Sequence, residues 1–294
     1  MNNKSFGACV QFSTVTFCLI MFSVSMFSMQ VQAQSLVSNE LKLMSFNIRY
    51  GTAKDGENSW QFRRENLMET IKKFDPEILG LQEALAFQVE EILQNFPKFT
   101  IVGVGRDDGK QAGEYSCILF DKNTFKPDTS ETFWFSETPT VPGSKHWGNN
   151  ITRICTWAKF TNLISKKQFF LYNIHLDHQS QTSREKSTEM LGAKIKSQKE
   201  SLPVIVTGDF NCGEENPAIK NMLNYGLEDS YRIKNAKSES EGTFNGFSGE
   251  TNGDRIDYIF ISKDIKVKSA EIIRDSYNRK FPSDHFPVTA VLLW

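Results

Sequence analysis

Short apolar runs, most of them followed by polar residues, set the strongest limit on how this 294-residue chain can fold. Runs of this length, bounded by turn-forming residues, predict β-strands rather than long helices. About ten strands are expected, at residues 41–48, 78–82, 99–104, 116–120, 153–160, 168–175, 203–209, 257–262, 265–274 and 288–293.

Between these runs, apolar residues recur at helical spacing in four places, at residues 63–74, 86–95, 184–199 and 216–225. Residues 105–113 and 138–150, which are rich in Gly, Pro and Asn, are expected to be loops. No repeat, low-complexity tract or linker divides the chain. The pattern therefore predicts sheets covered by helices within one domain.

The first forty residues follow different rules, because residues 5–39 contain no Asp, Glu, Lys or Arg. Lys4 precedes an apolar stretch from Phe6 to Met29, and the triplet Val31-Gln32-Ala33 has the small-x-small pattern of a cleavage site. Residues 1–33 are therefore predicted to be a signal peptide, and residues 34–294 a single exported domain, periplasmic or extracellular. The alternative is an uncleaved membrane anchor, which the interspersed polar residues and the cleavage triplet disfavour.

The predicted mature chain is nearly neutral, with 33 basic residues (34 less Lys4) against 35 acidic ones. This balance gives no support to a broad nucleic-acid footprint, although a local basic face is compatible with it. Its cysteines are Cys117, Cys155 and Cys212, and an odd number cannot form a complete internal disulfide framework. No obligate protein partner is indicated, and we expect a monomer.

Polar side chains that can bind ions or move protons follow several of the strands. Ligand and catalytic groups collect where strands end, because a rigid strand fixes the direction of the residues that follow it. If these ends share one edge, the converging side chains are Asn47, Glu83, His175, Asp209, Asn211, Asp257, Asp284 and His285. Carboxylates and amides without cysteine suit a hard cation such as Mg²⁺ or Mn²⁺.

The same segments, in the same order, resemble the motifs of the endonuclease/exonuclease/phosphatase superfamily across essentially the whole mature chain. The matching segments are Ser45-Phe46-Asn47, Leu81-Gln82-Glu83, Arg153, Asn173-x-His175, Gly208-Asp209-Phe210-Asn211, Arg255-Ile256-Asp257-Tyr258 and Ser283-Asp284-His285. The resemblance implies an α+β fold, a four-layer α/β/β/α sandwich of two packed mixed β-sheets flanked by helices. It also implies a metal-dependent hydrolase of phosphoesters with the site at one end of the sandwich.

Roles for single residues follow from the resemblance. Glu83 would be the main metal ligand, with Asn47 beside it and Asp284 near a metal position. His285 would contact the scissile phosphate while Asp257 holds its other ring nitrogen. The remaining roles are water orientation or deprotonation for Asp209 and positioning of water or phosphate for Asn211. His175 would bind phosphate and take part in catalysis, and Arg153 would bind phosphate.

Asp177, His178 and Arg255 are candidate residues of the substrate rim. The segment Asn173-x-His175-x-Asp177-His178 also resembles the zinc signature of metallo-β-lactamase-type hydrolases, but Asn173 replaces its first histidine. Such a site would lack ligands, because the mature chain has four histidines in all. A remote alternative is therefore a zinc hydrolase of that type.

The substrate is left open between three classes of phosphoester: nucleic acid, phospholipid headgroup and phosphorylated sugar or inositol. A nuclease is modestly favoured. Its contacts to the phosphate backbone of a nucleic acid would come from loop residues Arg106, Lys110 and Lys145. A sphingomyelinase-like enzyme would need an exposed aromatic hairpin, for which Phe133-Trp134-Phe135 is the candidate, although a buried strand explains this run better. A non-enzymatic binding module for phosphorylated ligands is the alternative outside catalysis, and intact Glu83, Asp209 and His285 argue against it.

Overall fold

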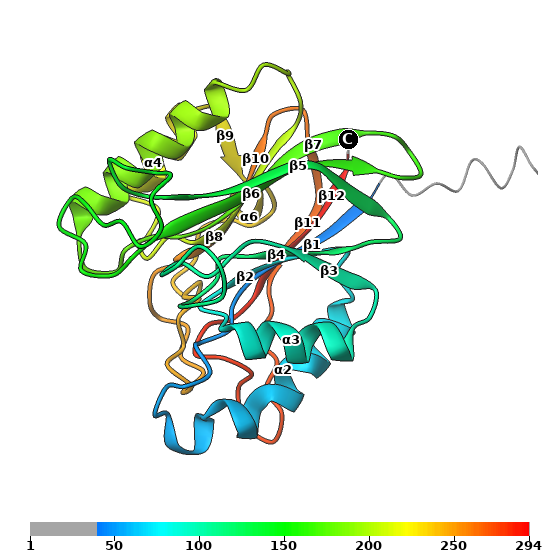
Figure 1. Cartoon of the computed structure of the whole chain (residues 1–294). Coiled ribbons are helices and arrows are strands. Elements are labelled where there is room, and N and C mark those ends of the chain that lie inside the picture. Colours follow the sequence, from blue (N-terminus) through cyan, green and yellow to red (C-terminus); the bar gives the residue numbers. More distant parts are fainter. Residues whose placement is uncertain (1–39, 294) are drawn as a thin grey trace, which may run out of the picture. The chain divides into compact units, whose positions relative to one another are not determined.

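A computed structural model describes residues 40–293, which form two six-stranded mixed sheets packed face to face with helices outside (Figure 1). The first sheet has the order β11-β12-β1-β2-β4-β3 and the second β5-β6-β7-β8-β10-β9. This arrangement confirms the predicted fold class. The predicted signal peptide and its predicted cleavage site after Ala33 lie outside the described residues. No helix among residues 40–293 is long and apolar enough to cross a membrane.

The strands of the first sheet are β1 (Glu40–Asn47), β2 (Ile78–Gln82), β3 (Phe99–Val102), β4 (Ile118–Asp121), β11 (Lys266–Ile272) and β12 (Val288–Leu293). Those of the second are β5 (Phe125–Trp134), β6 (Ile154–Asn162), β7 (Gln168–His175), β8 (Val204–Asp209), β9 (Leu227–Asp229) and β10 (Asp257–Ser262). The helices are η1 (Gly56–Asn58), α2 (Trp60–Phe74), α3 (Ala86–Asn95), α4 (Gln181–Lys196), α5 (Pro217–Asn224) and α6 (Ser230–Lys234).

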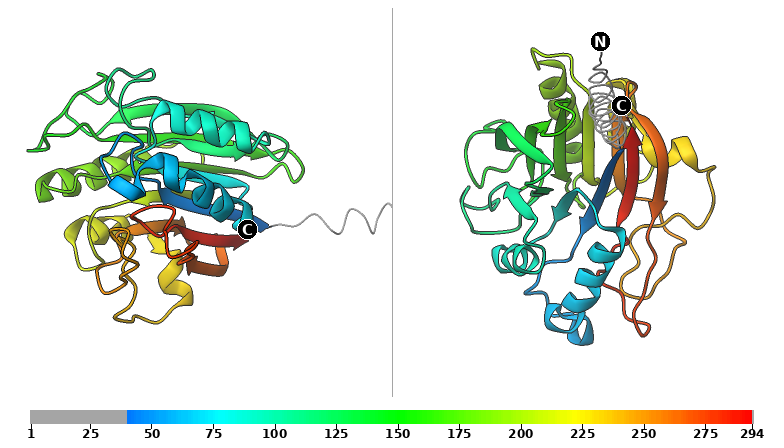
Figure 2. Two further views of the ribbon diagram at one scale, coloured as in Figure 1. Left: turned by 90° about the horizontal axis from the view of Figure 1, so that it is seen from below. Right: turned by 90° about the vertical axis from the view of Figure 1, so that its right-hand side faces the viewer.

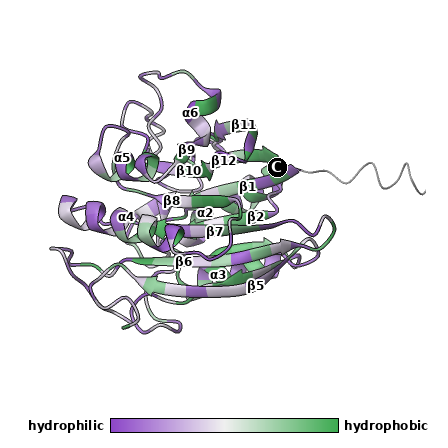
Figure 3. Ribbon diagram, turned by 90° about the horizontal axis from the view of Figure 1, so that it is seen from above, coloured by the Kyte–Doolittle hydropathy of each residue, from purple (hydrophilic) through white to green (hydrophobic). Residues whose placement is uncertain are grey.

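Three hydrophobic clusters fill the three spaces between the four layers. Leu43 and Ile78 of one sheet pack with Leu171 and Ile205 of the other in the central cluster. A second cluster joins β1 and β2 to α2 and α3, and a third joins β7 and β8 to α4 and α5. Hydrophobic residues accordingly follow the central strands, and hydrophilic ones mark α4 (Figure 3).

Each sheet contains one parallel pair at its centre, β1 with β2 and β7 with β8, while its other neighbouring strands are antiparallel. Parallel strands end at the same edge, so Asn47 aligns with Gln82 and His175 with Asp209. The antiparallel partners β10 and β12 begin where β8 and β1 end. Figure 2 shows β1 (blue) beside β12 (red). The strand pairing therefore brings the predicted site residues to the strand ends of their two sheets.

Alternation along the strands decides which of these side chains face the space between the sheets. Successive strand residues point to opposite faces, so Asn47 shares a face with Leu41 and Leu43, and Asp209 shares one with Ile205. The inner face of each sheet thus changes from apolar to polar toward one end. The predicted site residues on these strands therefore lie on the core-facing side of each sheet, next to its apolar part, and not on the solvent-facing side.

Asn173 fixes the polar end of the two sheets to one another. Its Nδ2 donates to the carbonyls of Leu81 and Cys117 at 2.8 Å each. Its Oδ1 accepts from Gln82 Nε2 at 2.7 Å and from Thr207 Oγ1 at 2.9 Å. These buried bonds connect β2 to β7 and β8 directly below the site, so the strand ends have a defined separation.

Four elements do not follow from the sequence pattern: η1, β5, β9 and α6. β5 is an edge strand with six consecutive exposed residues and a register shift between Pro127 and Thr129, so it shows no apolar alternation. Its end corrects the aromatic-hairpin hypothesis, because Phe133, Trp134 and Phe135 are at most 4% exposed. The run is a buried strand end, as the alternative interpretation predicts.

Candidate active site

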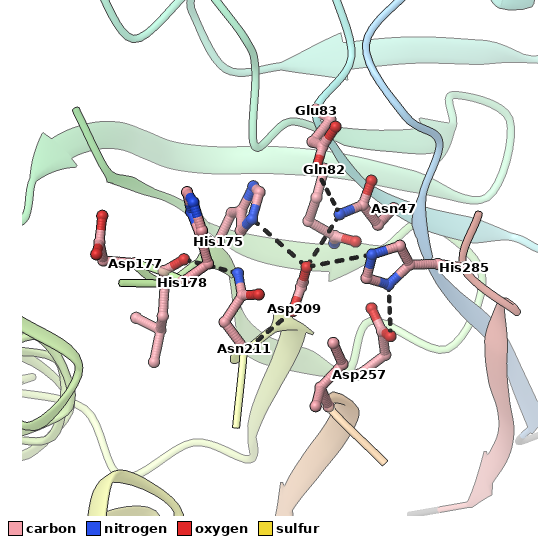
Figure 4. A network of polar contacts seen from close by, with 12 residues as sticks. Asn47, Gln82, Glu83, His175, Asp177, His178, Asp209, Asn211, Asp257 and His285 are labelled. Carbon is pink, nitrogen blue, oxygen red and sulfur yellow. Dashed lines mark hydrogen bonds and ion pairs between the residues drawn. The ribbon is translucent and has the colours of Figure 1, made fainter. Parts of the chain in front are cut away.

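Asp209 lies at the centre of a buried polar network at the end of β8 (Figure 4). Its Oδ2 accepts a hydrogen bond from Asn47 Nδ2 at 2.9 Å, and its Oδ1 accepts from the backbone N–H of Asn211 at 2.8 Å. His175 Nε2 is 3.4 Å from the same Oδ2. Burial and the neighbouring Asp257 raise the pKa of Asp209 to about 7, which suits a base at neutral pH.

His285 approaches Asp209 from the loop before β12. Its Nδ1 lies 2.9 Å from Asp257 Oδ2, and its Nε2 lies 3.8 Å from Asp209 Oδ2. Burial disfavours a charged imidazole, but the attraction of Asp257, Asp209 and Asp284 outweighs it and raises the pKa of His285 well above its usual value. These carboxylates therefore favour the imidazolium form of the ring, in which Nε2–H is available to an anion.

His175 has the opposite electrostatic character although it faces the same carboxylate. Burial lowers its pKa well below the usual value, and the positive charges of Arg153 and Arg106 lower it further. The structure thus holds one charged and one neutral histidine on either side of Asp209. Two groups with separated pKa values can donate and accept protons in one site at one pH.

Glu83 and Asn211 hold their side chains at the site with backbone in the left-handed region, at φ of 59° and 52°. Glu83 Oε1 accepts from Asn47 Nδ2 at 3.1 Å, and its Oε2 accepts from the Tyr50 N–H at 3.2 Å. Asn211 Nδ2 donates to the Leu176 carbonyl at 3.0 Å. Such strained backbone is often found at functional sites, where the surroundings stabilise it.

The loops that carry Asn47 and Asp284 are joined by two buried side chains. Ser283 Oγ donates to the Asn47 carbonyl at 2.7 Å. The guanidinium of Arg63, 1% exposed, donates to the carbonyls of Ile48 and Pro282 at 2.7 and 2.9 Å. Burial lowers the pKa of Arg63 to about 10. Arg63, on α2, was not apparent as a site residue in the sequence because only its tertiary contacts show its role.

A cavity of about 620 Å³ opens over this network. Its lining includes seven of the predicted residues, Glu83, Arg153, His175, Asp209, Asn211, Asp284 and His285, together with His178 from the predicted rim. Asn47 and Asp257 lie behind it as hydrogen-bond partners. The structure therefore brings together the residues that the strand-end pattern selects, and adds Arg49, Tyr50, Arg106, Glu114 and Phe244.

Two of the candidate rim residues, Asp177 and Arg255, are buried and do not line the cavity. Asp177 is 1% exposed, accepts from the backbone N–H groups of Gln179 and Ser180, and lies 3.6 Å from Arg153 Nε. Arg255 forms ion pairs with Glu214 and Asp229 and does not line the cavity. Asp177 is thus a positioning residue for Arg153, and the rim prediction for Arg255 is corrected to a buried ion pair.

His178 is exposed at the cavity, where its Nδ1 lies 3.0 Å from Arg153 Nη2. His175 faces Asp209, whereas Asp177 points away from this centre (Figure 4). Three zinc ligands therefore do not converge from the segment 173–178, and the metallo-β-lactamase-type alternative has no geometric support. The metal-compatible group found among the described residues is Asp209, Asp257 and His285, with ligand atoms within 4.8 Å of one another.

This geometry accompanies clear similarity to known proteins. A family model described as the endonuclease/exonuclease/phosphatase family matches residues 44–285. An endonuclease/exonuclease/phosphatase from Bacteroides vulgatus is 34% identical, with a TM-score of 0.81 over 87% of this chain and 99% of that one. A mannosyl-6-phosphatase from Bacteroides thetaiotaomicron is 33% identical, with a TM-score of 0.82 over 86% of this chain and 100% of that one.

Proposed function

The chain belongs to the endonuclease/exonuclease/phosphatase family, and from this premise we propose that it is an exported, divalent-metal-dependent hydrolase of sugar phosphomonoesters. The observation that carries the proposal is that His285, backed by Asp257, faces Asp209 in a cavity that Glu83 also lines. A charged donor, a base and a carboxylate for a cation are then present in one space. These are the groups that transfer of a phosphoryl group to water requires.

Asp209 acts on the nucleophile. A water molecule attacks phosphorus, a new P–O bond forms, and the bond from phosphorus to the sugar oxygen breaks; the sugar oxygen keeps the electron pair of that bond and takes a proton from solvent. Asp209 accepts the proton that the water loses, and the Asn47 and Asn211 hydrogen bonds keep its carboxylate in one orientation. A base whose pKa is about 7 is well matched to this task at neutral pH.

His285 and Arg153 act on the phosphate oxygens. Negative charge develops on these oxygens in the transition state, so fixed donors lower the barrier. His285 Nε2–H is oriented by the Nδ1 bond to Asp257, and Arg153 is held between Asp177 and His178. Neither group needs to reorganise during the reaction.

The side chains around Glu83 fit a hard divalent cation better than the Asp209–Asp257–His285 group, because the raised pKa of His285 disfavours the neutral form that binds a metal. Glu83 and Asp284 line the cavity, where burial raises the pKa of Asp284 and the charge of Glu83 raises it further. Carboxylates crowded in this way are stabilised by a cation, and oxygen ligands favour Mg²⁺ or Mn²⁺. Such an ion, held by Glu83 and Asp284, would supply charge neutralisation at the phosphate. Asn47 Oδ1 accepts from the Arg49 N–H, so its role as a ligand stays a prediction.

Two observations favour a sugar phosphomonoester over nucleic acid. The first is the 33% identity to a mannosyl-6-phosphatase. The second is that Arg49 and Arg106, which line the cavity, are already paired with Asp55 and Glu114. Paired arginines do not form the basic stripe that a duplex backbone requires. The nuclease, sphingomyelinase-like and binding-module alternatives are tested in the same experiment.

The test uses purified residues 34–294 with mannose 6-phosphate, DNA, RNA and sphingomyelin as substrates. We expect phosphate release from mannose 6-phosphate with Mg²⁺ or Mn²⁺, complete loss with a chelator, and recovery when either metal is restored. Glu83→Gln should raise the metal concentration for half-maximal activity about tenfold or more, because it removes one ligand charge. The control is Glu57→Gln, whose side chain is 89% exposed.

Cleavage of DNA or RNA without sugar phosphatase activity would replace the proposed substrate class with nucleic acid. Activity that persists in the chelator, or that only zinc restores, would contradict the proposed metal chemistry. Binding of phosphorylated ligands without turnover of any substrate would favour the binding module.

A further inference from the structure

Phe244 is a large apolar side chain at the catalytic cavity that the proposed chemistry does not use. It lines the cavity, is 51% exposed, and meets the His285 ring edge-on with ring centroids 5.2 Å apart. Folding gains little from an exposed aromatic ring, whereas a ligand that covers the ring gains apolar contact. Its position beside a catalytic histidine therefore points to contact with the substrate.

The backbone around Phe244 is tied to the catalytic residues. Asn245 N donates to the Asp284 carbonyl at 2.7 Å, and Phe286 N donates to the Thr243 carbonyl at 2.7 Å. Thr243 Oγ1 accepts from the backbone N–H of Asp257 at 3.1 Å. The ring is thus carried by a segment fixed to both sides of the His285–Asp257 pair, and a pre-organised contact costs little entropy on binding.

A second unused feature of the cavity is the ion pair between Arg106 and Glu114. The two side chains form bidentate contacts of 2.6 and 2.8 Å and are 14% and 16% exposed. Trp134 Nε1 donates to the Arg106 carbonyl at 2.6 Å, which anchors the loop that carries the arginine. Together the pair offers carboxylate acceptors and guanidinium donors, which can bind adjacent hydroxyl groups.

A flat apolar surface and a donor–acceptor pair match the two faces of a sugar ring. A pyranose has a face of C–H groups that packs on an aromatic ring, and its hydroxyls both donate and accept hydrogen bonds. A nucleobase would also pack on Phe244 but has no adjacent hydroxyls. Ligand pockets commonly combine apolar contact with a few fixed polar groups in this way.

The geometry points to a sugar-binding subsite in which Phe244 packs against the pyranose ring and the Arg106–Glu114 pair binds its hydroxyls. This inference rests on the proposed function, because it places the leaving group of a sugar phosphate whose phosphorus lies at His285 and Asp209. Phe244 and Glu114 are then specificity-determining residues. They select the alcohol from which phosphate is removed.

The test compares kcat/KM for mannose 6-phosphate with kcat/KM for glycerol 3-phosphate, whose leaving group has no ring. In Phe244→Ala the ratio of the two should fall about tenfold, mainly through a higher KM for the sugar phosphate, because the ring contact is lost. Phe244→Tyr should restore the ratio, since it returns an aromatic surface. Glu114→Gln should also lower the ratio. Phe62→Ala is the matched control, because Phe62 is 56% exposed on α2.

An unchanged ratio in Phe244→Ala would overturn the subsite, as would an equal loss on both substrates, which would assign Phe244 to support of His285 alone. Adenosine 5′-monophosphate serves as a third substrate, and a change in kcat/KM confined to it would overturn the subsite in favour of a base-binding surface. If the wild type hydrolyses glycerol 3-phosphate but not mannose 6-phosphate, the sugar-binding subsite is refuted, whereas the proposal of phosphoester hydrolysis is retained. Inactivity on every phosphoester would remove the proposed function and the subsite together.

Discussion

Replacement of His285 by glutamine is expected to lower kcat about a thousandfold while KM changes little. In the proposed mechanism the imidazolium Nε2–H is the charged donor to the phosphate, whereas glutamine provides a neutral donor without the Asp257 partnership. The loss falls on the transition state because charge on the phosphate oxygens grows there. Steady-state kinetics with mannose 6-phosphate and saturating Mg²⁺ measure the effect.

His146→Gln is the control for this substitution. His146 lies in the loop at residues 138–150, where its Nδ1 accepts from the Glu137 N–H, and it does not line the cavity. Its substitution should leave kcat within about twofold of the wild type. Activity of His285→Gln within tenfold of the wild type would remove His285 from the mechanism.

The substitution Asp209→Asn should lower kcat about a thousandfold or more, because an amide cannot accept the proton of the attacking water. It should change the melting temperature by only a few degrees, because two effects oppose one another. Asp209 is 1% exposed, and burial and Asp257 disfavour its charged form, so a neutral isostere relieves that repulsion. The amide keeps only one acceptor oxygen, however, for the two donors Asn47 Nδ2 and Asn211 N–H. Kinetics and thermal unfolding of the same preparation separate the two effects.

Loss of activity together with a large loss of stability would assign Asp209 to the framework rather than to the reaction. Retention of activity would identify another base. The combination of a stable and inactive protein distinguishes a catalytic carboxylate from a structural one without a second variant.

The sequence is most informative where the direction of a side chain depends only on its place along one strand. Alternation along β1 and β8 puts Asn47 and Asp209 on the core-facing side, and β2 (Ile78–Gln82) and α3 (Ala86–Asn95) begin and end at the predicted residues. Motif order then fixed the superfamily and hence the two-sheet sandwich. Local periodicity and short motifs were sufficient for these features.

Features that depend on distant partners were not predictable in the same way. Arg255 looks like a rim residue beside Asp257, but Glu214 and Asp229 neutralise it through the fold. The partnership of Arg106 with Glu114 spans a loop, and the position of Phe244 depends on the bonds that its neighbours Thr243 and Asn245 form with the loop before β12. The local sequence does not show the partners of these arginines or the exposure of Phe244, because both depend on residues that are distant along the chain.

Edge strand β5 was missed for a related reason. Its middle residues are exposed, so they carry no apolar pattern, and its pairing with β6 alone defines it as a strand. Propensity and periodicity report burial more strongly than hydrogen bonding.

The most direct test of water attack on phosphorus rather than on carbon is hydrolysis of mannose 6-phosphate in ¹⁸O-enriched water, with mass spectrometry of the phosphate and of O6 of the mannose after a single turnover. The predicted result is metal-dependent release of phosphate that carries one ¹⁸O atom from solvent, with unlabelled O6; the anomeric oxygen is not scored because it exchanges with water. Label at O6, which requires cleavage of the carbon–oxygen bond, would contradict the mechanism. Absence of phosphate release with either Mg²⁺ or Mn²⁺ would contradict the proposed function itself.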